Sequence, residues 1–246
     1  MNEQQFYETV GKMNGWDFSQ VRSKTEGEQW DFYDEVARSS SGLEVLLDIG
    51  TGGGEKVMEI ASSFTSIVAI DQSKAMIETA KANQEKSFIE NLHFLQASAE
   101  NLPFPDGRFD LASSRHAPFS ASEVWRVLKE NGIFFSQQVS EADKLNLKTA
   151  FGRGQSFDDT DGTLCEKYTK ELTAAGFSKV EVFEYDAVEY FERPEDLIFL
   201  LTHTPIIPSF GEQEDDFEIL QKFIADNQTE KGIKTNSKRF LLIAKK

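Results

Sequence analysis

The segment Val45-Leu-Leu-Asp-Ile-Gly-Thr-Gly-Gly-Gly54 joins an apolar run directly to a glycine-rich turn, with an acid just inside the run. Leu43 to Ile49 predicts a buried parallel strand, because such strands are covered on both faces and read as continuous apolar stretches. Glycines at 50, 52 and 54 permit a tight turn and a close approach of the backbone to a ligand. Glu55 to Phe64 predicts a helix whose free N–H groups face the same crevice. The segment is typical of a site for a nucleotide-like cofactor.

Two classes of cofactor use such a turn, and the residue after the last glycine separates them. A dinucleotide site needs its third glycine three residues after the second, where pyrophosphate meets the helix N-terminus. That position holds Glu55, whose carboxylate would repel pyrophosphate, whereas Asp48 suits a ligand that carries an ammonium group. The residues therefore favour a cofactor with an ammonium group over a dinucleotide.

A second apolar strand, Ser66-Ile-Val-Ala-Ile-Asp71, also ends in an acid and precedes a predicted helix from Ser73 to about Lys86. The Asp71 carboxylate can accept hydrogen bonds from both hydroxyls of a ribose. An aspartate at a strand end is equally typical of a helix cap, so both roles stay open for Asp71.

Two more elements follow in the same alternating pattern. A strand from Leu92 leads into the polar loop Ala97-Ser-Ala-Glu-Asn-Leu-Pro-Phe104, before the next strand near Leu111. Further on, Glu123 to Val139 predicts a helix that closes at Asn131-Gly132 and a strand that begins at Ile133.

This series resembles the class I S-adenosylmethionine-dependent methyltransferases of the small-molecule, UbiE-like type. The family's first motif corresponds to Asp48-x-Gly50-x-Gly52-x-Gly54, and the resemblance covers roughly Leu43 to Val139. It implies S-adenosylmethionine as cofactor, with Ser98 and Ala99 beside the adenine ring. The implied cofactor site comprises Asp48, Gly50, Thr51, Gly52, Gly54, Asp71, Gln72, Ser98, Ala99, Glu100 and Ser114.

The fold expected is α/β, a doubly wound, seven-stranded Rossmann-like sheet, and the resemblance implies the strand order 3-2-1-4-5-7-6 with the last strand antiparallel. The strands lie near 43–49, 66–70, 91–96, 109–113, 133–139, 179–191 and 238–244. We expect a single methyltransferase domain over residues 1–246. Its parts are a helical N-terminal cap (1–42), a cofactor-binding core (43–139) and the C-terminal half of the sheet (140–246).

Two regions outside the core are expected to control access to the site. Residues 1–42 carry many aromatic side chains, which require burial and predict helices over the cofactor. Residues 194–232 predict a short helix from Pro194 to Leu201 and an amphipathic one from Phe217 to Asn227. This insertion fits a lid and a buttress of the sheet edge equally well. The aromatic residues of the first region are Phe6, Tyr7, Trp16, Phe18, Trp30, Phe32 and Tyr33.

The composition limits the classes of molecule that the protein is expected to bind. The net charge of -16 argues against nucleic acid and for a small-molecule acceptor, because affinity for nucleic acid comes mainly from cations. No transmembrane run and no secretory signal are apparent, so we expect a cytoplasmic protein without a membrane partner. The single cysteine, Cys165, forms no internal disulfide, and no metal-ligand spacing occurs. The basic C-terminus predicts a solvated strand edge rather than an RNA-binding strip; it contains Lys231, Lys234, Lys238, Arg239, Lys245 and Lys246.

The chemistry implied is direct in-line displacement at an already activated methyl group, for which alignment and exclusion of water supply much of the rate. A base is needed only if the nucleophile is a hydroxyl or an acidic carbon. His116, in Ser113-Ser-Arg-His116 just past the fourth strand, is the candidate catalytic base, and a plain pocket-wall role is its alternative. An RNA-base methyltransferase and a non-catalytic S-adenosylmethionine-binding protein remain as alternative functions.

Overall fold

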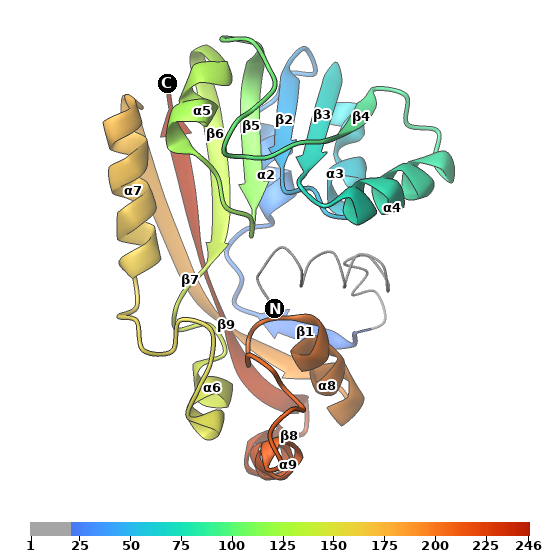
Figure 1. Cartoon of the computed structure of the whole chain (residues 1–246), viewed down its shortest axis with the longest axis vertical. Helices are drawn as coiled ribbons and strands as arrows, with labels where there is room; N and C mark the ends of the chain where they lie inside the picture. The colour runs from blue at the N-terminus through green and yellow to red at the C-terminus, as the bar shows by residue number, and fades with distance from the viewer. Residues whose placement is uncertain (1–20) are drawn as a thin grey trace.

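The computed structural model describes residues 21–246 (Figure 1). Nine strands form one mixed sheet in the order β1-β7-β9-β6-β5-β2-β3-β4, with β8 paired to β9. The strands are β1 (Ser23–Glu26), β2 (Val45–Ile49), β3 (Ser66–Asp71), β4 (Leu92–Gln96), β5 (Phe109–Arg115), β6 (Leu128–Val139), β7 (Lys179–Phe191), β8 (Gln228–Thr229) and β9 (Gly232–Lys245).

Helices cover both faces of this sheet, as in a doubly wound α/β protein. One apolar core lies under α5 and α7, and the other lies under α2, α3 and α4. Both cores are built from the apolar strands, whose side chains alternate between the two faces. The helices are α2 (Phe32–Arg38), α3 (Glu55–Glu59), η1 (Ala61–Ser63), α4 (Lys74–Glu85), α5 (Ala121–Val127), α6 (Leu145–Phe151), α7 (Thr163–Ala175), α8 (Pro194–His203) and α9 (Asp216–Asn227).

The Rossmann-like α/β fold is as expected, but the sheet is larger than the seven strands predicted. Strand β1 pairs antiparallel with β7, and the two-residue β8 pairs antiparallel with β9. Both additions are short and polar, so no hydrophobic pattern marks them, and register with a long neighbour holds them in place. Strands β2 to β6 pair in parallel, whereas β9 runs antiparallel to both β6 and β7.

The expectation of a lysine-protected sheet edge at the C-terminus is wrong, because β9 lies inside the sheet between β6 and β7. Several of its cations are paired with acids. Lys238 forms an ion pair with Asp161, and Arg239 forms one with Asp143. Lys231, just before β9, pairs with Glu26. This pairing also removes charge from the surface that an RNA-binding strip would need.

Two predicted helices end earlier than the sequence suggests. Helix α5 ends at Val127 rather than near Asn131, because Leu128 already pairs with Phe109 in the sheet. Asn131 then takes a left-handed conformation, with φ of 63°. The helix after the glycine turn is also short, since α3 ends at Glu59 and a 3-10 turn follows.

The late insertion, residues 194–232, packs around a small apolar core. Leu197 and Leu201 of α8 meet Leu220 and Phe223 of α9, together with residues of α6, β7 and β9. The N-terminal cap is only partly helical over its described part: Ser23–Glu26 is a strand and Phe32–Arg38 a helix. Phe6, Tyr7, Trp16 and Phe18 lie outside the described residues. Among residues 21–246, no helix has the length and apolar character to span a membrane.

Candidate cofactor and acceptor site

Most of the predicted cofactor residues lie at one edge of the sheet, where parallel strands present their carboxyl ends. In the register of the sheet, Asp48 lies beside Ala69 on β3 and Ser113 on β5, and Asp71 lies beside Gln96 on β4. Ligands of open α/β sheets bind outside this edge, where the strand order reverses on either side of the first strand. In this chain that strand is β2, which carries the glycine turn.

The glycine turn is held by contacts that no larger residue would permit. Gly50 and Gly54 have φ of 74° and 79°, in the left-handed region that favours glycine. A Cβ on Gly50 would lie 2.2 Å from the Ala117 Cβ, and one on Gly54 would lie 2.5 Å from the Phe94 ring. The turn is therefore packed directly on the loop after β5 and on β4. The Thr51 amide donates to the Ile70 carbonyl at 3.0 Å.

Backbone donors fix the Asp71 carboxylate next to this turn. The amide of Gly52 donates to its Oδ2 at 3.0 Å, and the amide of Ser73 donates to its Oδ1 at 2.8 Å. The N-cap of α4 is Ser73, whose hydroxyl accepts from the Met76 amide. The helix-capping role is thus taken by Ser73 and not by Asp71. A carboxylate offers about four acceptor positions, so this geometry is compatible with ribose hydroxyls.

Asp48 is fully buried and held by hydroxyl groups. The Ser113 hydroxyl donates to Oδ1 at 2.7 Å, and the Tyr33 hydroxyl lies 3.3 Å from each oxygen. Burial raises the pKa of Asp48 to about 6, although the hydroxyl donors and the Arg115 charge oppose the shift. A ligand cation near Asp48 would stabilise its carboxylate and so offset the free-energy cost of ionising it in a buried position. Tyr33 was not among the predicted site residues, and the aromatic clustering before residue 42 was its only signal.

Glu55 places a negative charge at the start of α3. Its Oε1 accepts from the Asn83 side chain at 2.8 Å, and a Cβ on Gly53 would lie 2.4 Å from that oxygen. The carboxylate therefore folds back over the glycine turn, where the pyrophosphate of a dinucleotide would meet the helix. This arrangement supports the choice of an adenosyl cofactor over a dinucleotide.

The remaining predicted residues line the rim or support it. Gln72 and Ser98 are exposed, and the Ser98 hydroxyl accepts from the Glu100 amide at 3.2 Å. The half-buried Ala99 packs against the core beneath that loop. Ser114 is buried and donates to the Ala117 carbonyl at 2.9 Å, so its hydroxyl shapes the loop after β5.

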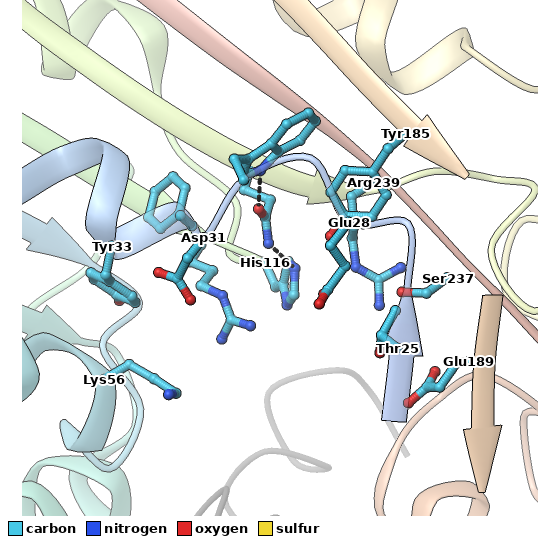
Figure 2. A pocket seen from close by; sticks show the side chains of 14 residues that line it. Thr25, Glu28, Asp31, Tyr33, Lys56, His116, Tyr185, Glu189, Ser237 and Arg239 are labelled. Atoms are coloured by element: carbon cyan, nitrogen blue, oxygen red, sulfur yellow. Dashed lines mark hydrogen bonds between the residues drawn. The ribbon is translucent and has the colours of Figure 1, made fainter. Parts of the chain in front are cut away.

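A cavity of about 210 Å³ adjoins the turn on the side of β5 and β6 (Figure 2). Tyr33 and Lys56 line it next to the glycine turn, whereas Tyr185, Glu189 and Arg239 line it on the side of β7 and β9. Residues 194–232 are not part of its described lining. The lining consists of Thr25, Glu28, Trp30, Asp31, Phe32, Tyr33, Lys56, Arg115, His116, Gln137, Tyr185, Glu189, Ser237 and Arg239.

His116 projects into this cavity at the end of a hydrogen-bonded relay (Figure 2). The Trp30 indole donates to Gln137 Oε1 at 2.7 Å, and Gln137 Nε2 lies 3.1 Å from His116 Nε2. The His116 side chain is exposed to the cavity. Desolvation of the ring by the neighbouring protein, followed by the charges of Arg115, Arg239 and Lys144, lowers the pKa of His116 well below its usual range. His116 is therefore neutral at pH 7. His203 instead stacks on Phe199, and His93 is exposed on β4.

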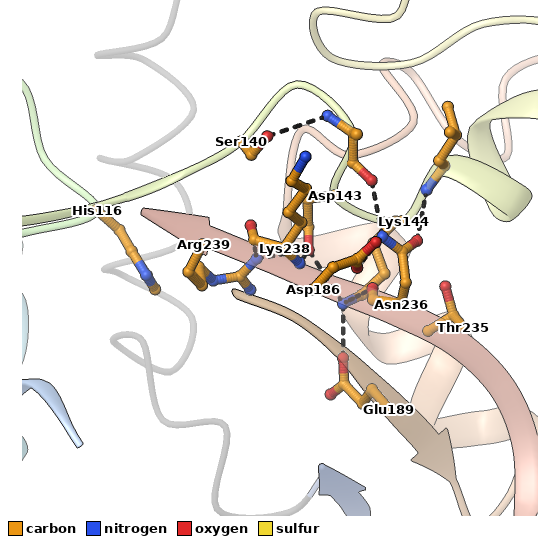
Figure 3. A network of polar contacts seen from close by, with 12 residues as sticks. His116, Ser140, Asp143, Lys144, Asp186, Glu189, Thr235, Asn236, Lys238 and Arg239 are labelled. Atoms are coloured by element: carbon orange, nitrogen blue, oxygen red, sulfur yellow. Dashed lines mark hydrogen bonds and ion pairs between the residues drawn. The ribbon is translucent and has the colours of Figure 1, made fainter. Parts of the chain in front are cut away.

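A network of buried charges lies behind Glu189 and Arg239, which line the cavity (Figure 3). Lys144 Nζ lies 2.6 Å from Glu189 and 3.6 Å from Asp143, and Asp143 also pairs with Arg239. Burial alone would raise the pKa of Asp143, but the charges of Lys144 and Arg239 outweigh it and hold that pKa below its usual range. No local sequence pattern marks this network, since its members lie up to 96 residues apart.

In the part of the chain that the structure describes, no three His, Cys, Asp or Glu side chains are grouped so as to hold a metal ion. A Rossmann-like sheet with an acid-flanked glycine turn and an adjoining cavity defines an α/β protein of the kind that binds nucleoside cofactors.

A family model described as a methyltransferase domain matches residues 40–184, which is more than half of the chain, and the protein belongs to this family. Its fold and family are those of the class I S-adenosylmethionine-dependent methyltransferases. The chain is 36% identical over 96 residues to an uncharacterized methyltransferase, YcgJ of Bacillus subtilis. It is 32% identical over 105 residues to the ubiquinone/menaquinone biosynthesis C-methyltransferase UbiE of Zymomonas mobilis.

These matches span 36% and 40% of the chain, and only 38% and 43% of the two relatives. Similar solved structures extend further. The YcgJ structure has a TM-score of 0.58 at 21% identity and covers 87% of this chain and 97% of that one. The [4+2]-cyclase SpnF has a TM-score of 0.58 at 19% identity, with 98% and 92% covered. At such identities the likeness concerns the fold alone, and SpnF shows that proteins of this fold are not restricted to one reaction.

Proposed function

We propose that the protein transfers the methyl group of S-adenosylmethionine to a small-molecule acceptor by direct in-line displacement. The observation that carries this proposal is the link between the cavity and the buried Asp48 below the glycine turn. Tyr33 belongs to both parts, since it lines the cavity and hydrogen-bonds Asp48. A cofactor held at the glycine turn would thus present its reactive end to a space that a small acceptor can enter.

Each half of the site has a defined task in this proposal. Asp71 holds the ribose hydroxyls, Asp48 faces the ammonium group, and the 98–100 loop covers the adenine. Gly50, Thr51, Gly52, Gly54, Gln72 and Ser114 form or support the surrounding wall. When bound, the cofactor supplies a methyl group on a sulfonium: a lone pair of the acceptor bonds to the methyl carbon as the carbon–sulfur bond breaks, which leaves S-adenosylhomocysteine.

The cavity favours a small acceptor over RNA. Its cations Lys56, Arg115 and Arg239 are matched in number by the acids Glu28, Asp31 and Glu189. No basic trough of the kind that neutralises phosphates is present in this described lining. A volume of about 210 Å³ also supports an enzyme over a non-catalytic binder, since an acceptor has room beside the turn.

The test is formation of S-adenosylhomocysteine from S-adenosylmethionine when the purified protein is incubated with pools of small molecules and, separately, with total RNA. The proposal expects product with a small-molecule pool, loss of that product in Asp71→Ala, and none above background with RNA. Product with RNA alone would favour the alternative enzyme. Cofactor binding without turnover on any pool would favour the non-catalytic reading.

A further inference from the structure

The relay behind His116 determines which ring nitrogen carries the proton. The Trp30 indole nitrogen can only donate, so the oxygen of the Gln137 amide must face it, at 2.7 Å. The amide nitrogen of Gln137 then faces His116 Nε2 at 3.1 Å and donates to it. A neutral imidazole that accepts at Nε2 carries its proton on Nδ1. No described residue hydrogen-bonds Nδ1, so His116 offers the cavity an N–H donor.

Arg115 is the cation of the cavity that lacks a protein partner among the described residues. Arg239 is paired with Asp143, and Lys56 lies 3.0 Å from Glu59. The Arg115 side chain, in contrast, forms no hydrogen bond or ion pair within residues 21–246, although it is half-buried. Its charge acts on Asp48 without direct contact. A partly desolvated guanidinium without a partner is unfavourable, and an anion that reaches it would relieve the cost. The acid Glu28 is also unpaired there but is exposed to water, which solvates its charge.

Backbone geometry brings these two donors to the same cavity. Successive side chains of an extended strand point to opposite faces, so Arg115 and His116 would diverge if β5 simply continued. His116 instead takes a left-handed conformation with φ of 57°, and its amide donates to the Gln137 carbonyl at 2.8 Å. A non-glycine residue rarely adopts this region, and functional sites are where such strain collects.

We propose that the methyl acceptor is a small-molecule carboxylate, anchored by the Arg115 guanidinium with the His116 Nδ1–H donating to the same group. The inference rests on the proposed function and narrows its substrate class. His116 then orients the acceptor as a hydrogen-bond donor instead of removing a proton as a base. The carboxylate is the anchor, and the atom that is methylated lies elsewhere on the acceptor.

The charges around the cavity favour a ligand with one negative charge over a ligand with two. Glu28, Asp31 and Glu189 all line the cavity and repel anions. The repulsion acts on two negative charges in a phosphate dianion but on only one in a carboxylate. A carboxylate also matches the planar arginine guanidinium, with which it forms two parallel hydrogen bonds. The carboxyl group of the cofactor itself is a competing occupant of Arg115, and the experiment below separates the two.

The first test reads the tautomer directly in the wild-type protein. Long-range proton–nitrogen NMR of the imidazole rings, with His116→Gln to assign its signals, should show a protonated Nδ1 and an unprotonated Nε2 at pH 7. Trp30→Phe removes the indole donor and should let the other tautomer appear. A proton on Nε2 in the wild-type protein would overturn the donor role.

The second test measures anion binding in the protein alone and in the protein saturated with S-adenosylhomocysteine. Benzoate is titrated against benzamide, its uncharged analogue, and against inorganic phosphate. Benzoate should bind at least tenfold more tightly than either and shift the His116 Nδ1 signal. Arg115→Gln should abolish this preference, while Arg108→Gln, just before the start of β5, should keep it. Equal binding of benzamide, or tighter binding of phosphate, would overturn the proposal that the acceptor is a carboxylate.

S-adenosylhomocysteine affinity distinguishes the remaining outcomes. It should stay within twofold in Arg115→Gln, and a large loss would assign Arg115 to the cofactor's carboxyl group and overturn the inference. Failure of the wild-type protein to bind S-adenosylhomocysteine would instead contradict the proposed function, with the benzoate titration of the protein alone still reporting on the anchor. Circular dichroism of each variant shows that it is folded.

Discussion

The two halves of the sheet hold their polar groups in different ways. In the half built on β2 to β5, the strands are apolar and buried, and the polar site is fixed by backbone amides and hydroxyl groups around Asp48 and Asp71. In the half built on β6, β7 and β9, ionised side chains are themselves buried: Asp143 and Lys144 are 3% and 2% exposed. The first half depends on local backbone geometry, and the second depends on charge balance among distant residues.

The largest effect is expected from breaking that charge balance. Asp143→Ala leaves the buried Arg239 without its ion-pair partner and removes one of the two acids beside Lys144, which keeps Glu189. Loss of one partner from a buried pair costs roughly 3 to 5 kcal/mol of unfolding free energy. Urea unfolding measures this cost. Glu166→Ala, which breaks the exposed pair with Lys170, is the matched control and should change little. Equal effects of the two substitutions would show that the network contributes no more than a surface pair.

The glycine turn tests the other half. Gly50→Ala combines a φ of 74° with a Cβ that would lie 2.2 Å from Ala117, so strain and overpacking together should cost about 2 to 4 kcal/mol. Gly107→Ala has a φ of 62° but nothing within 4 Å of the added Cβ, and it should cost only about 1 kcal/mol. Chemical unfolding compares them. A Gly50 variant as stable as the Gly107 variant would mean that the turn can move away from the loop after β5.

A smaller effect with a distinctive pH dependence is expected at Asp48. Its pKa is raised from 3.8 to about 6, so the folded protein binds this proton more tightly than the unfolded chain and loses stability as pH rises from about 4 to 6. Asp48→Asn removes that loss and should stabilise the protein at pH 7 by up to about 3 kcal/mol, less what the altered hydrogen bonds cost. The difference in unfolding free energy between variant and wild type, measured from pH 4 to 8, should grow up to pH 6 and then level. A difference that does not change with pH would contradict the shift.

Asp48→Asn should also weaken the binding of S-adenosylhomocysteine, because the ammonium group of this ligand loses its counterion. In the wild type, affinity should fall as pH drops below about 6, where Asp48 is protonated. Stability and binding can therefore be told apart, because Asp48→Asn is expected to raise the unfolding free energy and to lower the affinity for S-adenosylhomocysteine.

The smallest expected effect is on cofactor affinity alone. Asp71→Ala should weaken the binding of S-adenosylhomocysteine by about 1 to 3 kcal/mol, the range for a lost hydrogen bond to a charged group. Titration calorimetry measures this change, and Glu78→Ala on the exposed face of α4 is the control. Unaltered affinity in the Asp71 variant would remove the ribose assignment.

The comparison also explains which parts were predictable from the sequence. Strands β2 and β3, with the glycine turn and the acids at positions 48 and 71, follow from local signals: apolar runs, glycine spacing and strand-ending carboxylates. Strand β1 carries no such signal, because its four polar residues are set by pairing with β7. The early end of α5 likewise depends on a tertiary contact, between Leu128 and Phe109.

The same division holds within the site. Family motifs mark the cofactor half, but the relay through Trp30, Gln137 and His116 joins residues up to 107 positions apart, and only the folded chain brings them together. Arg115 stands next to a predicted residue and was still missed, because nothing in the sequence shows that its neighbours leave it unpaired. Charge balance is a property of the fold, and single-sequence patterns do not record it.

Isothermal titration of the purified protein with S-adenosylhomocysteine and, separately, with NAD tests the central claim most directly. An adenosyl site built on Asp48, Glu55 and Asp71 predicts micromolar binding of S-adenosylhomocysteine and no measurable binding of NAD. Binding of NAD in preference to S-adenosylhomocysteine, or of neither, would contradict the claim that this turn is a cofactor site for methyl transfer.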